Sequence, residues 1–271
     1  PEMDGMEVLE RIRQEQLSDA GVIILTGHGT IELAVVATQR GAFHFVTKPC
    51  GLAELDVLIK KAVVHQRLAR DNELLRNEVA KLAGPSEILG QSAKMSALLR
   101  EIEKLSRSNA PVLITGESGT GKELVARRIH ALSLRPNGPF LAVNCAALQD
   151  TLLESELFGY EKGAFTGAGA RKIGLLESAE GGSVLLDELG AMSIGVQAKL
   201  LRVLQFGTFT RVGGKTELSL DVRILAATNQ LLHKSIKEGR FREDLYFRLN
   251  TFEVVVPPLR DRMGDVPLLA R

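Results

Sequence analysis

The sequence contains no tryptophan, only two tyrosines and only two cysteines among its 271 residues. The scarcity of large aromatic rings argues against a surface that stacks the bases of single-stranded nucleic acid. Cys50 and Cys145 lie far apart and outside any Cys-x-x-Cys pattern, which argues against a disulfide framework or a zinc site. We therefore expect a chain that works in a reducing, cytoplasmic setting.

The chain also lacks an excess of one charge and a long apolar run. A formal net charge of +1 gives no support for a protein that coats nucleic acid. No apolar run approaches the about 18–20 residues that a membrane helix needs, and no secretory signal opens the sequence, so we expect no membrane contact. The hydrophobic share of 45% excludes a disordered chain, and the length is typical of about two domains.

Residues 1–50 alternate between helical and extended patterns. They predict a helix over 6–13, a strand over 22–25, a helix over 31–40 capped by Thr30 and Gly41, and a strand over 43–46. Two strands cannot bury both faces of a parallel sheet, so we expect this part to be an incomplete α/β unit.

A helix is expected over 52–82, which contains neither glycine nor proline. Leucines recur every seven residues within it, at Leu68, Leu75 and Leu82. One interpretation is a single amphipathic connecting helix, and the other is a short parallel coiled coil in which Asn72 sets the register. Gly84-Pro85 ends the helix and marks a domain boundary.

A phosphate-binding loop is expected after the apolar run 111–115. It fits GxxxxGK between a strand and a helix over 122–131, and consists of Gly116, Glu117, Ser118, Gly119, Thr120, Gly121, Lys122 and Glu123. Glycines let backbone N–H groups surround phosphate oxygens, the helix N-terminus adds its dipole, and Lys122 bridges the β- and γ-phosphates. Because Glu123 stands where a hydroxyl residue is usual, Mg²⁺ must rely on phosphates, water and another acidic residue.

Two later apolar runs end in polar residues that suit this chemistry. The run 184–186 is followed by Asp187 and Glu188. In phosphoryl-transfer sites the first acid holds Mg²⁺ and the second activates water. A further run ends at Asn229, which either bonds the γ-phosphate or the attacking water, or simply forms a turn. The alternation of strands and helices predicts an α/β fold with a mostly parallel sheet covered on both faces.

Arg242 and Arg248 allow two interpretations. Six residues correspond to about 240° of helical rotation, so the two side chains point the same way only if one lies at the end of the element. Either they pair with Glu243 and Asp244 on a surface helix, or they act as arginine fingers on a neighbour's nucleotide.

The stretch 159–172 combines four glycines and three alanines with a single phenylalanine, Phe165. It predicts a mobile loop with Phe165 at its tip, suited to docking on another protein. The alternative is that Phe165 folds back onto the body of the domain.

These residues carry a family resemblance. The run Gly163-Ala164-Phe165-Thr166-Gly167-Ala168 matches the GAFTGA loop of bacterial enhancer-binding proteins, the AAA+ activators of sigma-54 RNA polymerase. Further runs resemble the same family, namely GESGTGKE at 116–123, NCAAL at 144–148 and ELFG at 156–159, together with 184–190 and 242–250. The resemblance covers nearly all of 86–271, and Glu123 is the residue that this family has.

Residues 1–50 resemble the C-terminal half of a receiver domain. The resemblance matches Thr26 to its hydroxyl position, Phe45 to its aromatic switch and Lys48-Pro49 to its lysine–proline pair, where a cis bond is expected. The whole resembles an NtrC-like response regulator, with part of a flavodoxin-like receiver over 1–64, a helical linker over 65–84 and an AAA+ core over 85–271. We expect its phosphoacceptor aspartate, helical lid and helix-turn-helix domain to lie outside this chain.

The resemblance implies roles for particular residues. Lys122 would hold phosphate, Asp187 would hold Mg²⁺ and Glu188 would activate water. Asn144 would pair with Glu188 as a switch, and Asn229 would be the first sensor. Arg242 and Arg248 would reach the nucleotide of the adjacent subunit, and Phe165 and Thr166 would contact sigma-54. Residues 88–90 would border the adenine.

The resemblance also implies ATP and Mg²⁺ as cofactors, a dimer that assembles into a hexameric ring, and sigma-54 RNA polymerase as the remodelled partner. A sensor histidine kinase would control the protein, and enhancer DNA would bind through the C-terminal domain outside this chain. Two alternatives stay open: an AAA+ ATPase that remodels another partner, and a nucleotide-binding module without turnover.

Overall fold

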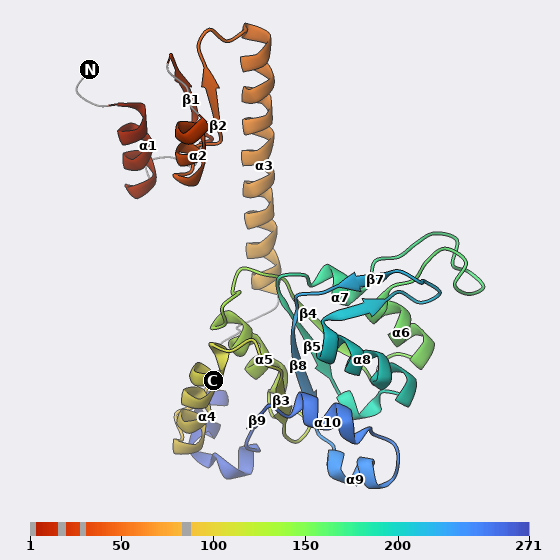
Figure 1. The fold of residues 1–271 in the computed structure, drawn as a ribbon. Helices are drawn as coiled ribbons and strands as arrows, with labels where there is room; N and C mark the ends of the chain where they lie inside the picture. The colour runs from red at the N-terminus through yellow and green to blue at the C-terminus, as the bar shows by residue number, and fades with distance from the viewer. Residues whose placement is uncertain (1–3, 16–19, 28–30, 83–87, 271) are drawn as a thin grey trace. The chain divides into compact units, whose positions relative to one another are not determined.

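The computed structural model describes residues 4–15, 20–27, 31–82 and 88–270. The chain divides into two compact units, Pro1–Pro85 and Ser86–Arg271. Each unit has its own buried cluster of apolar side chains. The helices and strands of both units are drawn in Figure 1.

In its described residues, the first unit contains two parallel strands and three helices. Its elements are α1 (Gly5–Gln14), β1 (Ile23–Thr26), α2 (Ile31–Gln39), β2 (His44–Thr47) and α3 (Leu52–Leu82). The strands pair from Ile23 opposite His44 to Thr26 opposite Thr47, one residue later than the apolar runs predict. A small core of Leu9, Ala37 and Ala42 holds α1 and α2 together. Thr30, the expected helix cap, lies outside the described residues.

Helix α3 runs without a break for 31 residues. The expected change from receiver to linker after residue 64 therefore falls inside one continuous helix. Leu58 and Ala62 are buried, whereas Val64 and Leu68 are exposed. The side chain of Asn72 lies outside the described residues, so the coiled-coil interpretation stays a prediction. Neither α3 nor any other described helix combines the length and the apolar character that a bilayer crossing requires.

The second unit is built on a five-stranded parallel sheet in the order β4-β5-β8-β3-β9. The strands are β3 (Val112–Thr115), β4 (Phe140–Asn144), β5 (Ser183–Asp187), β8 (Arg223–Thr228) and β9 (Phe252–Val255). Strand β3 lies between β8 and β9, so the strand order reverses there. Ligands of parallel α/β sheets bind beyond the carboxyl ends of the strands at such a point.

Helices cover both faces of this sheet, as the alternation predicts (Figure 1). The helices are α4 (Ala93–Ser106), α5 (Lys122–Ala131), α6 (Asp150–Phe158), α7 (Leu175–Ser178), α8 (Ile194–Phe206), α9 (Leu232–Lys237), α10 (Glu243–Leu249) and α11 (Val266–Leu269). Successive residues of β3 belong to two different cores: Val112 and Ile114 pack with α4 and α5, whereas Leu113 belongs to the core that includes α6, α8 and α10. Short 3₁₀ turns are η1 (Leu189–Ala191), η2 (Leu259–Asp261) and η3 (Met263–Asp265).

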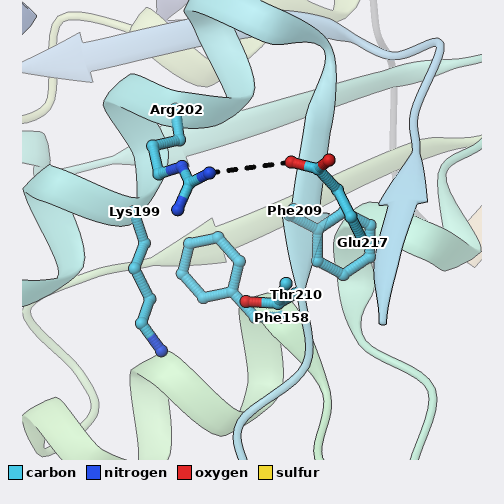
Figure 2. A pocket seen from close by; sticks show the side chains of 6 residues that line it. All are labelled: Phe158, Lys199, Arg202, Phe209, Thr210 and Glu217. Atoms are coloured by element: carbon cyan, nitrogen blue, oxygen red, sulfur yellow. Dashed lines mark ion pairs between the residues drawn. The ribbon is translucent and has the colours of Figure 1, made fainter. Parts of the chain in front are cut away.

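An antiparallel hairpin stands apart from the main sheet. It consists of β6 (Thr208–Thr210) and β7 (Glu217–Ser219). A cavity of about 90 Å³ lies where it meets α6 and α8 (Figure 2). The two basic side chains there are already paired, Arg202 with Glu217 at 3.6 Å and Lys199 with Glu154. This cavity therefore belongs to the packing of the hairpin on α6 and α8.

Arg223 is a buried cation that holds the end of α4. Its guanidinium donates hydrogen bonds to the carbonyls of Leu105 (2.9 Å), Ser106 (3.0 Å) and Ala110 (3.3 Å). The last carbonyls of a helix have no partner within the helix, and Arg223 supplies donors for them. Burial lowers the pKa of Arg223 to about 10.

We expect Arg223→Met to lower the free energy of unfolding by about 3 kcal/mol, because the buried Ser106 carbonyl loses its charged donor, whereas the Leu105 carbonyl still accepts the N–H of Ser108 at 3.2 Å. Arg100→Met is the matched control, since Arg100 is exposed on the same helix. Urea unfolding of both variants checks the expectation, and equal losses would contradict it.

Candidate nucleotide-binding site

The expected phosphate loop connects β3 to α5. Helix α5 begins at Lys122, as predicted, and Gly121 caps it with a left-handed φ of 97°. Gly119 is also left-handed at 76°. A Cβ on Gly116 would lie only 3.0 Å from the carbonyl oxygen of Val256, so a larger residue here would press on the backbone that follows β9. The loop thus turns tightly into the positive end of a helix, where anions bind.

Lys122 is buried inside this loop. Its ammonium donates to the carbonyls of Gly116 and Glu117, both at 3.1 Å. A phosphate is a charged and therefore stronger acceptor than these carbonyls. The lysine is positioned to exchange them for phosphate oxygens when an anion enters the loop.

The acidic pair lies at the end of β5. Asp187 Oδ1 accepts the backbone N–H of Glu188 at 2.9 Å. Glu188 has a left-handed φ of 51°, unlike every other non-glycine residue in the described part of the chain. A carboxylate residue held in a conformation that glycine prefers is typical of a functional position.

Asn144 ends β4 opposite Asp187 in the sheet register. Its Oδ1 accepts the N–H groups of Ala146 (2.9 Å) and Ala147 (3.2 Å), so it caps the turn that follows. The pairing of Asn144 with Glu188 therefore stays a prediction, and it would have to use the amide nitrogen. Next to Asn144, burial raises the pKa of the Cys145 thiol to about 12, which makes this cysteine an inert core residue.

Asn229 follows β8 and lines a cavity of about 480 Å³ together with Gly116 and Glu117. The structure thus brings the expected first sensor to the same cavity as the start of the phosphate loop. Tyr246 also lines this cavity, and its hydroxyl lies 3.0 Å from His233 Nε2 and accepts Asn250 Nδ2 at 2.8 Å. Sequence reasoning missed this trio, because its members carry no local motif.

Arg242 is the N-cap residue of α10, and Arg248 lies in its last turn. Arg242 therefore comes from the end of the helix, which is the condition under which two side chains six residues apart can point the same way. Arg242 Nη2 pairs with Asp244 Oδ2 at 2.7 Å, and this hydrogen bond raises the pKa of Arg242 and lowers that of Asp244. In the single chain Arg242 therefore forms the surface ion pair with Asp244. Contact with the nucleotide of a neighbouring subunit stays a prediction.

The GAFTGA loop, residues 163–168, closes on itself. The N–H of Gly163 donates to the carbonyl of Ala168 at 2.8 Å, and Gly163 and Gly167 have left-handed backbones. Phe165 is 46% exposed, and its ring lies edge-on to Tyr160 with centres 4.9 Å apart. Phe165 thus rests on its own loop instead of entering the core of the domain.

A buried ionic cluster, which sequence reasoning also missed, holds the base of this loop. Arg211 follows β6, is only 7% exposed and pairs with Glu161 at 2.8 Å and with Glu177 at 2.7 Å. The N–H of Glu161 also donates to the carbonyl of Val212 at 3.0 Å. The loop and the β6–β7 hairpin, which project from the same side of the unit in Figure 1, therefore share one base.

Two of the residues expected of a receiver domain, Thr26 and Lys48, meet where β1 and β2 end. Thr26 ends β1, and its carbonyl accepts the N–H of Lys48 at 2.7 Å. Phe45 lies within β2 and is partly buried. The peptide bond between Lys48 and Pro49 is cis, as the resemblance implies.

A phosphate loop after β3 and an acidic pair after β5, on a parallel sheet of this order, define a AAA+ P-loop nucleotide-binding domain. The chain belongs to the sigma-54 interaction domain family, because residues 88–255 match that family's profile. Residues 1–60 match the response regulator receiver domain.

Known relatives agree with this assignment. The chain is 47% identical over 270 residues to the regulatory protein AtoC of Escherichia coli K12, and 49% identical over 271 residues to the transcriptional regulator NtrC of Proteus hauseri. All of this chain is covered, against 58% and 56% of those relatives, so it spans little more than half their length. A crystal structure of NtrX from Brucella abortus in complex with ATP matches with a TM-score of 0.73 at 42% identity, covering 98% of this chain and 56% of that one.

We expect Arg211→Gln to release the base of the GAFTGA loop, because glutamine cannot bridge Glu161 and Glu177. Hydrogen exchange of the amides of Glu161, Gly163 and Val212 should accelerate about tenfold or more, as the loss of a charged hydrogen bond implies. Arg202→Gln is the control, since its ion pair lies on the exposed side of the hairpin. Unchanged exchange in Arg211→Gln would show that the cluster does not hold the loop.

Proposed function

We propose that this chain is the ATP-hydrolysing part of an activator of sigma-54 RNA polymerase. One observation carries the proposal: a single unit combines a phosphate loop and an acidic pair with the projecting GAFTGA loop. Membership of the sigma-54 interaction domain family supports this reading, as does the ATP complex of the structurally similar NtrX.

The site residues divide the chemistry among them. Lys122 and the start of α5 would bind the β- and γ-phosphates. The Asp187 carboxylate offers the hard oxygen ligand that Mg²⁺ prefers, with phosphate oxygens and water completing its coordination. When bound, Mg²⁺ would neutralise charge on the phosphates.

Glu188 is placed to act as the general base. Water attacks the γ-phosphorus, its proton passes to the Glu188 carboxylate, and the bond to the bridging oxygen breaks to release ADP and phosphate. Asn229 would orient the water or the γ-phosphate from the cavity that it lines together with Gly116 and Glu117. The strained backbone of Glu188 fixes its direction before ATP binds.

A ring of subunits would complete the site. Arg242 lies at the exposed start of α10 and is paired only by a surface contact with Asp244. Exposed ion pairs contribute little to stability, so a neighbour's phosphate can replace Asp244 at small cost. We propose that Arg242 and Arg248 act in this way in a hexamer.

Regulation would enter through the first unit. Thr26 and Lys48 meet at the carboxyl ends of the receiver strands, where a phosphorylated aspartate of this fold would be sensed. We propose control by a sensor histidine kinase and action on enhancer DNA in the cytoplasm, through parts outside this chain.

We expect Glu188→Gln to abolish hydrolysis and to preserve ATP binding, because the amide keeps the side chain's size but cannot accept the proton. Phosphate release should fall by about 100-fold or more, while the Kd for a fluorescent ATP analogue stays within about twofold. Glu103→Gln, on the exposed side of α4, is the matched control. Turnover at the original rate would remove Glu188 from the role of base.

We expect Phe165→Ala to spare ATP hydrolysis and to weaken binding to sigma-54 about tenfold or more, because it removes an exposed aromatic anchor. Pull-down with sigma-54 in the presence of ADP and aluminium fluoride measures this. Phe206→Ala is the control, since Phe206 is exposed at the end of α8. Joint loss of hydrolysis and binding would instead assign Phe165 a structural role, and wild-type protein without nucleotide-dependent binding would contradict sigma-54 as the partner.

A further inference from the structure

The segment 259–265, here called the strap, touches both the phosphate loop and the start of α4. It consists of the two 3₁₀ turns η2 and η3 and follows β9. Its charged side chains point to two different partners. Arg260 and Arg262 contact the phosphate loop, whereas Asp265 contacts residues 91–92, just before α4.

The contact with the phosphate loop includes its backbone. Arg262 Nη2 donates to the carbonyl of Thr120 at 3.2 Å. The Thr120 hydroxyl in turn donates to the carbonyl of Glu117 at 2.8 Å, which closes the loop. Because C=O and N–H of a trans peptide point in opposite directions, holding the Thr120 carbonyl aims the N–H of Gly121 away from the strap.

The contact with the start of α4 is fully buried. Asp265 is 0% exposed and accepts the N–H groups of Gln91 (2.7 Å) and Ser92 (2.8 Å) and the Ser92 hydroxyl (2.7 Å). Ser92 caps α4. A Cβ on Gly90 would lie 3.3 Å from Asp265 Oδ2, so residues 90–92 pack closely on the strap.

Arg262 lies in the strap between these two contacts, and its buried guanidinium is incompletely hydrogen-bonded. It is 8% exposed, its Nη1 reaches only the sulfur of Met95 at 3.4 Å, and its Nε has no hydrogen-bond partner among the described residues. A buried cation with incomplete hydrogen bonding is a poor device for stability, since an apolar side chain of similar size often serves better. Its hydrogen bond to the phosphate loop is the contact that an apolar residue could not make.

We infer that Arg262 is a positioning residue for nucleotide binding, which rests on the proposed function. Through Thr120 it holds the phosphate loop so that Gly121 presents its N–H to phosphate. Through the strap and Asp265 it fixes the position of that loop relative to residues 90–92. Arg262 itself touches no nucleotide.

The test compares three variants of the 271-residue chain by titration with a fluorescent ATP analogue and Mg²⁺. Arg262→Met should raise the Kd about tenfold or more, because it removes a charged donor from the loop. Arg262→Lys should recover most of the affinity, to within about threefold of wild type. Arg260→Met is the matched control on the same strap: its ion pair with Glu117 is exposed, so the Kd should change less than about threefold.

Two further readouts separate positioning from folding. A variant that merely misfolds loses binding sites, so the stoichiometry falls while the Kd of the remaining sites is unchanged, and that result would overturn the inference. Positioning instead predicts full stoichiometry, a raised Kd and faster hydrogen exchange at the amides of 118–122 without nucleotide. If Arg262→Met does not fold, Arg262→Gln, which stays polar but loses the charged guanidinium, carries the test: the amides of 118–122 should exchange faster than in wild type, and wild-type exchange would overturn the inference.

Two measurements separate the role of Arg262 from the proposed function: the affinity of Arg262→Met and the binding of the analogue by the wild-type chain. Wild-type affinity in Arg262→Met would overturn the role of Arg262 and leave the proposed function intact. A wild-type chain that fails to bind the analogue would contradict both.

Discussion

Strand β3 pairs in parallel with both β8 and β9, and the nucleotide site depends on this arrangement. Because all five strands run the same way, their carboxyl ends share one edge, and the segments that leave them meet there. The phosphate loop leaves β3, the acidic pair ends β5, and Asn229 follows β8. Residues more than a hundred positions apart thus converge without any metal or disulfide among the described residues.

Three buried guanidiniums fix the segments that the sheet cannot hold. Arg223 binds the carbonyls at the end of α4, Arg211 ties the GAFTGA loop to the hairpin, and Arg262 holds the phosphate loop. Arg223 and Arg262 donate to backbone carbonyls at a helix end and in a loop, whereas Arg211 pairs with two carboxylates. The planar fork of arginine reaches several acceptors at once, which suits such places better than lysine.

Local pattern predicted the parts of this fold that local chemistry determines. Helix α5 begins and ends where the glycine-rich turn and the apolar spacing predict, and the strands expected at the apolar runs 22–25, 43–46, 111–115 and 184–186 lie within a residue or two of those runs. Strands β6, β7 and β9 were not predicted. The structure shows no break at the boundary expected between receiver and linker after residue 64, because residues 52–82 form one continuous helix. Long-range partners were missed: Asp265 meets Ser92 across 173 positions, and no local spacing tells a carboxylate which distant donor it will bind.

The GAFTGA loop combines a tight base with a loose tip, and this contrast determines how it can move. At the base, a Cβ on Gly159 would lie 2.5 Å from the Lys172 carbonyl, and one on Gly174 would lie 2.4 Å from the Gly159 nitrogen. The two sides of the loop therefore touch backbone to backbone, with Arg211 buried beside them. At the tip, a Cβ on Gly163 or Gly167 would meet no atom within 4 Å. The contacts of the tip lead back to the hairpin and the base: a Cβ on Gly213 would lie 2.7 Å from the Cβ of Ala164, and the ring of Phe165 packs on Tyr160. A shift of the base and the hairpin together would therefore carry the tip with it.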